Sequence, residues 1–184
     1  SQIRIFDPAC GCGNFLILAY RELRELEIEM LKAINPKDKH GLETRVLDIS
    51  SLSKIDVDQF YGIELEEFPA RIAETAMWLV DHQMNIKLSE TFGQAFVRLP
   101  LKKSAKIGHG NALTTDWKTV IVPEKLSYII SNPPFIGKHL MSDEQSNEID
   151  DIFKGIDGSG NLDYVCGWYA KAADYMKGTK IKAA

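Results

Sequence analysis

The chain has 184 residues, of which 45% are hydrophobic and 26% are charged, and its formal net charge is −4. This composition predicts one folded domain with a sizeable core, and it excludes an intrinsically disordered chain, a membrane-spanning segment and a signal peptide. The acidic balance also argues against a free-standing module that grips duplex nucleic acid, because such modules are usually basic.

The first half of the chain predicts two strand–helix pairs. The apolar run 3–6 leads into Asp7 and predicts a buried strand. An amphipathic helix is expected to follow and to end near Asn35, with Glu and Arg on its outer face and Leu16, Ala19, Tyr20, Leu23, Leu26, Met30 and Leu31 on its inner face. Residues 59–64 predict a second strand, and Pro69 marks the first turn of a helix that runs to about residue 84. Residues 36–56 and 85–104 are predicted to be connectors.

The second half adds strands at 106–111 and 126–131, a polar stretch at 136–160 and a helix at about 162–177. Alternating strands and helices predict an α/β fold, with a mostly parallel sheet covered by helices. In such sheets ligands bind beyond the carboxyl ends of the strands. Both ends of the sequence suggest a piece of a larger protein, and a fifth strand is expected to begin near Ile181.

A glycine loop follows the first predicted strand, at residues 7–15 (Asp-Pro-Ala-Cys-Gly-Cys-Gly-Asn-Phe). Glycines let the backbone approach a ligand closely, and the helix that follows offers unpaired N–H groups. The dinucleotide fingerprint fails because its third glycine is Leu16, and the Lys-Ser/Thr of a Walker loop is absent. A generic glycine turn remains the alternative interpretation of this motif alone.

Two further motifs end predicted strands. Glu64 ends the second strand, where an acid can accept hydrogen bonds from both hydroxyls of a ribose, and Leu65 beside it can pack on an adenine ring. Residues 132–135 (Asn-Pro-Pro-Phe) follow the fourth strand. Two prolines force a rigid path and leave carbonyls free, an Asn adds another acceptor, and a Phe offers a stacking face. This set suits a planar ring with an exocyclic amino group. The alternatives are an ordinary surface glutamate and a proline-rich turn.

Together, the motifs at 7–15 and 132–135 resemble those of S-adenosylmethionine-dependent DNA adenine-N6 methyltransferases, D-P-x-x-G-x-G-x-F and [DN]-P-P-[YF]. A closer resemblance, carried by residues 61–73 and 132–137, is to MmeI-like type II restriction–modification enzymes. It implies a Rossmann-like class I methyltransferase fold. It also implies that residues 1–184 are a partial methyltransferase domain, truncated on its C-terminal side, without the nuclease and target-recognition regions that such enzymes carry.

The resemblance also assigns roles to residues. The implied S-adenosylmethionine-binding residues are Asp7, Pro8, Ala9, Gly11, Gly13, Phe15, Glu64, Leu65, Asn111 and Ala112. Many relatives carry Asp where this chain has Asn111, and an Asn there can still accept or donate hydrogen bonds to the cofactor adenine. The implied catalytic residues are Asn132, Pro133, Pro134 and Phe135. Asn132 and Pro133 would accept hydrogen bonds from the target N6, and Phe135 would stack on the flipped base.

Three alternatives stay open at this stage. The function expected from the resemblance is adenine-N6 methylation of double-stranded DNA, with most DNA contacts outside this fragment. The Asn-Pro-Pro-Phe loop also serves RNA and protein-glutamine methyltransferases, and the chain could be an inactive cofactor-binding fragment. No metal site is expected, because Cys10 and Cys12 lack a second pair of ligands. The three cysteines are too few for a disulfide framework, which favours a cytoplasmic protein. Self-association through a truncated sheet edge is a further expectation.

Overall fold

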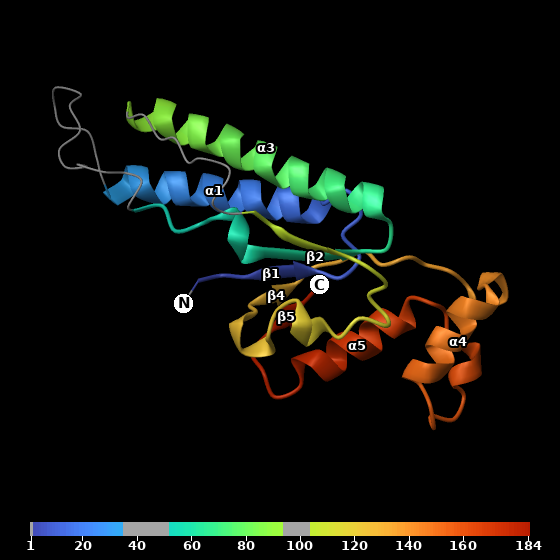
Figure 1. Ribbon diagram of the computed structural model, residues 1–184. Helices are drawn as coiled ribbons and strands as arrows, with labels where there is room; N and C mark the ends of the chain where they lie inside the picture. The colour runs from blue at the N-terminus through green and yellow to red at the C-terminus, as the bar shows by residue number, and fades with distance from the viewer. Residues whose placement is uncertain (1, 35–51, 94–103) are drawn as a thin grey trace.

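The computed structural model describes residues 2–34, 52–93 and 104–184, and in this part of the chain five strands form one sheet between two helical layers (Figure 1). The sheet order is β3-β2-β1-β4-β5, and every neighbouring pair is parallel. The strands are β1 (Ile5–Asp7), β2 (Phe60–Glu64), β3 (Lys106–His109), β4 (Tyr128–Ile129) and β5 (Lys182–Ala183). The predicted α/β fold with a parallel sheet is confirmed, and so is the fifth strand.

The two faces of the sheet bury separate cores. Successive side chains of a strand point to opposite faces, so Ile5 joins the core under one helical layer whereas Phe6 joins the other. On β2 the same alternation sends Phe60 to the first core and Tyr61 to the second. Burial on both faces explains why these strands are short, continuous apolar runs.

The first core is covered by α1 (Asn14–Ile34) and α3 (Glu67–Phe92), which lie side by side above the sheet in Figure 1. Helix α3 runs eight residues beyond the predicted end at 84, so the expectation of a connector from residue 85 was wrong. The helix ends at Gly93, which adopts φ 64° and donates its N–H to the Ser89 carbonyl. The remainder of the predicted connector at 94–103, and most of that at 36–56, lies outside the described residues.

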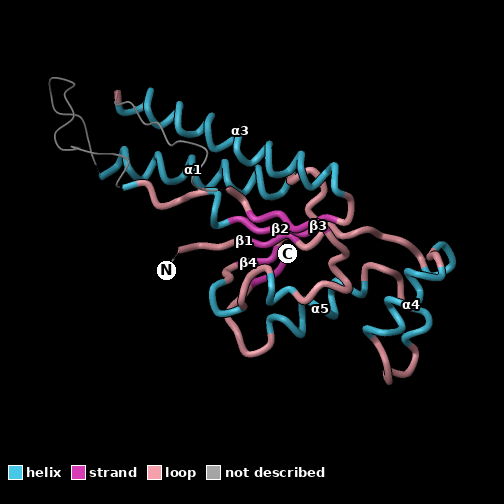
Figure 2. Tube along the Cα trace, viewed as in Figure 1, coloured by secondary structure: helices cyan, strands magenta, loops and turns pink. Residues whose placement is uncertain are grey.

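The second core is covered by α5 (Cys166–Met176), with α4 (Asp143–Ile152) packed beside it (Figure 2). Helix α4 lies in the stretch predicted to be irregular. It buries only Ile149, and most of its residues are polar or charged, so the sequence resembles a polar loop. Its start carried a readable signal, the capping box in which Ser142 accepts from the Gln145 N–H while the Gln145 side chain accepts from the Ser142 N–H. Short 3₁₀ helices occupy Val57–Gln59, Trp117–Thr119, Pro123–Lys125, Lys138–Leu140 and Ser159–Asn161.

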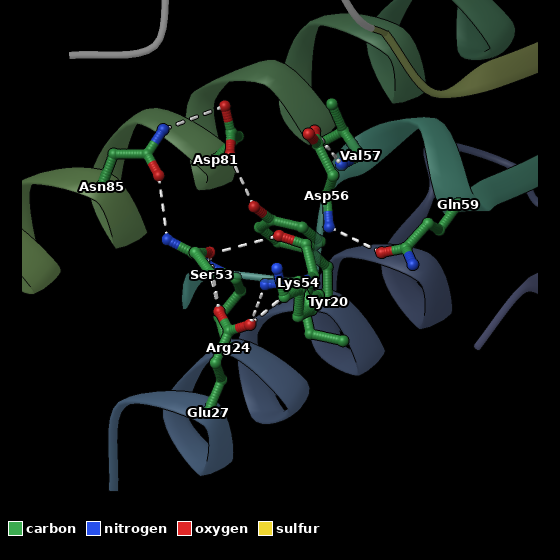
Figure 3. A network of polar contacts seen from close by, with 11 residues as sticks. Tyr20, Arg24, Glu27, Ser53, Lys54, Asp56, Val57, Gln59, Asp81 and Asn85 are labelled. Carbon is green, nitrogen blue, oxygen red and sulfur yellow. Dashed lines mark hydrogen bonds and ion pairs between the residues drawn. The ribbon is translucent and has the colours of Figure 1, made fainter. Parts of the chain in front are cut away.

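A buried polar network joins α1 to α3 (Figure 3). Arg24, which was predicted to lie on the outer face of α1, is fully buried, whereas Leu26 and Met30 of the predicted inner face are exposed. The Arg24 guanidinium donates to Glu27 at 2.8 Å and to Asn85 Oδ1 at 2.9 Å, and also to Ser53. Asn85 in turn donates to Asp81, which also accepts from the Tyr20 hydroxyl. These buried polar positions interrupt the apolar pattern of α3, which explains why the sequence prediction ended that helix early.

The two sheet edges are formed by β3 and β5. Lys182 and Ala183 of β5 are exposed, and the expected self-association through this edge stays a prediction. None of the helices in the described ranges has the length and apolar character that crossing a membrane requires.

Candidate active site

A cavity of about 380 Å³ opens at the carboxyl ends of the strands. It lies where the crossovers leave the sheet, since Pro8 follows β1, Leu65 follows β2, Gly110 follows β3 and Asn132 follows β4. Of the predicted site residues, it is lined by Pro8, Ala9, Gly11, Glu64, Leu65, Asn111, Ala112, Asn132 and Pro134. Both halves of the predicted site, the glycine loop and the Asn-Pro-Pro-Phe loop, therefore meet at one cavity.

Glu64 ties the glycine loop to the end of β2. Its Oε2 accepts the Gly11 N–H at 2.8 Å, and its Oε1 accepts the Glu66 N–H at 3.0 Å. The Cys10 N–H donates to the Ile63 carbonyl at 3.0 Å and adds a second link between the two strand ends. Each carboxylate oxygen has a further lone pair, so Glu64 can hold the loop and still accept hydrogen bonds from a ligand in the cavity.

Gly13 and Phe15 do not line the cavity. Gly13 has φ 86°, and a Cβ built on it would lie 3.1 Å from Ala73 Cβ and 3.3 Å from Ala73 Cα. The glycine is therefore required for the close approach of the loop to α3. Phe15 is exposed at the start of α1. The structure thus supports a packing role for Gly13, and it does not bring Phe15 to the cavity.

Asp7, the last residue of β1, does not line the cavity and is completely buried. Its Oδ1 accepts from the Ala9 N–H at 3.0 Å and from the Ser131 hydroxyl at 2.6 Å, so it joins the two predicted loops. Its Oδ2 has no hydrogen-bond partner within the described residues. Burial raises the pKa of Asp7 to about 6, although the bonds from Ser131 and Ala9 oppose this.

The raised pKa of Asp7 predicts a pH-dependent loss of stability. A carboxyl group whose folded pKa lies above its unfolded pKa stabilises the fold when protonated, so stability falls as pH rises from about 4 to 6. A rise from 3.8 to about 6 corresponds to about 3 kcal/mol. We expect Asp7→Asn to remove this decline, measured as the free energy of urea unfolding between pH 4 and 7. The exposed Asp157→Asn is the matched control, and an equal decline in wild type and Asp7→Asn would contradict the prediction.

The Asn-Pro-Pro-Phe loop starts from a well-anchored position. Ser131 binds Asp7 through its hydroxyl and donates its N–H to the Ala184 carbonyl at 3.2 Å. Pro133 is buried, whereas Phe135 is 72% exposed, and neither residue lines the cavity. No hydrogen bond in the described part of the chain uses the Asn132 side chain or the Pro133 carbonyl. The acceptors that the sequence predicted in this loop therefore remain available.

Four further residues, which the sequence did not predict, form a wall of the cavity. This wall consists of Gln145 on α4, Trp168 on α5, Tyr164 just before α5, and Ile136. The Trp168 Nε1–H donates to the Pro8 carbonyl at 3.1 Å, and the Tyr164 N–H donates to the Ile136 carbonyl at 2.9 Å. The capping box at Ser142 was the one sequence signal for this wall, because it marks the start of α4.

Asn111 and Ala112 complete the cavity after β3. Ala112 is buried, and Asn111 is half-buried. The Asn111 Oδ1 accepts the Leu113 N–H at 2.8 Å, and its Nδ2 donates to Glu148 at 2.6 Å. Within the described residues, no group of three or more His, Cys, Asp or Glu side chains is placed to hold a metal ion. The cysteines are free thiols; Cys10 is buried, and its burial raises the pKa of that thiol.

Comparison with known proteins gives a consistent result over the whole chain. Residues 1–184 match the family described as "MmeI, DNA-methyltransferase domain". The chain is 34% identical to DNA methyltransferase A of Bacillus subtilis (strain 168) over 187 residues, which is all of this chain and 20% of that protein.

Solved structures agree with this match. The chain is similar to the Type IIL restriction-modification enzyme MmeI, solved in complex with DNA, with 47% identity and a TM-score of 0.90 over 98% of this chain and 24% of that one. The ATP-dependent Type ISP enzyme LlaBIII, solved bound to DNA, has a TM-score of 0.59 at 13% identity, over 96% of this chain and 12% of that one, so it shows a shared fold only. The chain thus spans only about a fifth to a quarter of the first relatives' length.

Proposed function

The chain belongs to the MmeI DNA-methyltransferase domain family, and we propose that it transfers a methyl group from S-adenosylmethionine to adenine N6 in DNA, as part of a restriction–modification enzyme. One observation carries the proposal. The glycine loop, Glu64 and the Asn-Pro-Pro-Phe loop, which lie far apart in the sequence, meet at one cavity at the carboxyl ends of the strands. A site of this position and size is typical of a small-molecule pocket in an α/β fold.

The residues around the cavity fit the proposed cofactor. Ala9 and Gly11 bring backbone close to the cavity floor, and Glu64 provides acceptors at the place where a ribose is held in related folds. The unpaired Oδ2 of buried Asp7 adds negative potential beneath the loop, which suits a ligand with an ammonium and a sulfonium group. When bound, S-adenosylmethionine supplies an electrophilic methyl group. Its adenine ring would lie on the side of the cavity that is lined by Leu65, Asn111 and Ala112.

The Asn-Pro-Pro-Phe loop fits an adenine that has left the duplex. The Asn132 side chain and the Pro133 carbonyl are free acceptors, and adenine N6 has two hydrogens to donate. Accepting both hydrogens draws the N6 lone pair away from the ring and towards the methyl group. The exposed ring of Phe135 can stack on the flipped base, which offsets part of the cost of unstacking, a few kcal/mol. Positioning and electrostatics therefore supply the catalysis that this chain contributes.

The partner and the place of action follow from the same proposal. Double-stranded DNA is the proposed partner, with most of its contacts made outside residues 1–184, because the chain is acidic and the relatives are four to five times longer. The nuclease and target-recognition parts would likewise lie outside this partial catalytic domain. The cytoplasm is the proposed location, and it suits the free thiols.

Two measurements test the proposal. Calorimetric titration with S-adenosylmethionine should give heat of binding, whereas no heat would support an inactive fragment. Methylation of DNA by the full-length protein, followed by nucleoside analysis, should then yield N6-methyladenine. Methylation of RNA or of protein glutamine in its place would assign the site to one of the alternative substrates.

Glu64→Gln is expected to weaken S-adenosylmethionine binding by about 30- to 100-fold, equivalent to about 2–3 kcal/mol. The glutamine has only one acceptor atom for the N–H groups of Gly11 and Glu66, so its amide nitrogen would face one of these donors. The ribose contact would be lost as well. Calorimetric affinity is the measurement. Glu66→Gln is the matched control because its side chain is exposed, and equal affinities of the two variants would refute the role of Glu64.

A further inference from the structure

Glu148 on α4 binds two residues of the cavity wall at once. Its Oε1 accepts from Asn111 Nδ2 at 2.6 Å, and its Oε2 accepts from the Tyr164 hydroxyl. On the other side of the amide, Asn111 Oδ1 accepts the Leu113 N–H at 2.8 Å. The amide therefore has a single favourable orientation, in which its nitrogen faces a carboxylate and its oxygen faces a backbone N–H.

Only an amide satisfies both neighbours of position 111. A carboxylate there could accept from Leu113, but it would place a second negative charge against Glu148. An alanine would leave both Glu148 and the Leu113 N–H without this partner. Because Asn has a second hydrogen on Nδ2 and a second lone pair on Oδ1, the held amide still has one donor and one acceptor for a ligand in the cavity.

Tyr164 connects this trio to the two predicted loops. Its hydroxyl remains a donor to Glu148 because burial, and then Glu148 itself, raise the pKa of that hydroxyl. Its N–H binds the Ile136 carbonyl just after the Asn-Pro-Pro-Phe loop, and its ring packs edge-on against Trp168 at 5.2 Å. Trp168 in turn donates to Pro8 in the glycine loop. A displacement of Glu148 would therefore affect the positions of both the glycine loop and the Asn-Pro-Pro-Phe loop.

We propose that Glu148 and Tyr164 are positioning residues, which hold the Asn111 amide in one orientation so that the cavity selects an adenine ring. Adenine presents an amino donor beside a ring-nitrogen acceptor, which is the complement of an amide oxygen beside an amide nitrogen. Hypoxanthine, which has an oxygen acceptor in place of the amino group, does not match. The inference rests on the proposed function, because the ring is taken to be that of the methyl donor.

A charge-swap experiment in the full-length protein tests the positioning. With Asn111→Asp, two carboxylates face each other and one must hold a proton, so S-adenosylhomocysteine affinity should fall at least about tenfold from pH 6 to pH 8. Combining Asn111→Asp with Glu148→Gln reverses the donor and acceptor. This pair should remove the pH dependence and raise the affinity above that of Asn111→Asp at pH 8, but not to the wild-type value, because a carboxylate at position 111 has no donor for the ring nitrogen. Charged groups among the described residues that lie near Asn111, Glu148 and Tyr164 include Glu144 on α4, which acts on Tyr164, Lys171 on α5, which donates to the Leu113 and Thr115 carbonyls, and Glu64, which lines the same cavity.

Ring selection has its own readout. Wild type should bind S-adenosylhomocysteine at least about tenfold more tightly than S-inosylhomocysteine, and Glu148→Ala should reduce that ratio at least about threefold, because the amide loses one of its two anchors. A purely structural role would weaken both ligands equally and leave the ratio unchanged, which would overturn the inference. The exposed Asp150→Asn, on the same helix, is the control.

The two proposals can fail separately. If wild type binds neither ligand, the proposed function and the ring selection both fail. The positioning can still be judged from thermal unfolding without ligand. The melting temperature of Asn111→Asp should fall as pH rises from 6 to 8, because the raised carboxyl pKa stabilises only the protonated form, and Glu148→Gln should cancel that fall. Strictly additive effects of the two substitutions at every pH would overturn the positioning.

Discussion

Asn132→Ala is expected to reduce DNA methylation by at least about 100-fold and to leave S-adenosylmethionine affinity within about threefold of wild type. Asn132 lines the cavity beside Pro134, and no hydrogen bond in the described part of the chain uses its side chain. Its oxygen is thus free for the target N6. Because the side chain supports no neighbouring structure, its removal should lower the rate of methyl transfer without loosening the cofactor pocket.

The measurement is single-turnover methylation of DNA by the full-length protein, with calorimetric cofactor affinity in parallel. Asn132→Asp keeps an acceptor oxygen and should retain more activity than Asn132→Ala. Asn161→Ala, at an exposed position in the 3₁₀ helix Ser159–Asn161, is the control for expression and folding. Unchanged N6-methyladenine in Asn132→Ala would remove Asn132 from the proposed mechanism.

The part of the site that could be predicted consists of local motifs at strand ends. The glycine loop follows β1, Glu64 is the last residue of β2, and Asn132 comes three residues after β4. A parallel sheet brings the carboxyl ends of its strands to one edge, so their meeting at one cavity follows from the order of elements. The residues of each motif lie within a few positions of one another, so each motif can be recognised in a single sequence without knowledge of the tertiary contacts.

The part that could not be predicted depends on contacts between distant residues. Trp168 reaches the Pro8 carbonyl across 160 positions of sequence, and no local pattern marks that pair. Helix α4 buries a single apolar residue and is mostly polar or charged, so its sequence resembles a polar loop. The same lack of local signal hid Glu148, whose role comes from two partners on other elements. Phe15 shows that a motif can also mislead. It belongs to the glycine-loop motif, but it is exposed and does not line the cavity.

Arg24 is the clearest case in which burial contradicts the residue type, and it carries the largest expected effect on stability. Arg24→Ala should lower the free energy of unfolding by about 3–5 kcal/mol. The substitution leaves Glu27, Ser53 and Asn85 without the guanidinium that joins them (Figure 3). The Glu27 carboxylate would then lack its buried cationic partner. An unpaired buried carboxylate lowers the free energy of unfolding much more than an exposed one, because water cannot replace the missing charge.

Arg21→Ala is the matched control for Arg24→Ala, one turn earlier on α1. Among the described residues Arg21 forms an ion pair with Glu22, and both side chains are at least half exposed. That ion pair should contribute about 0.5 kcal/mol or less. Urea unfolding of the two variants gives the comparison directly. Equal, small losses would mean that α1 and α3 are held by their apolar contacts alone, and that the glycine loop at the start of α1 does not depend on the network for its position. A large loss for Arg24→Ala alone would show that a polar network inside one helical layer holds in place α1, the helix that follows the glycine loop.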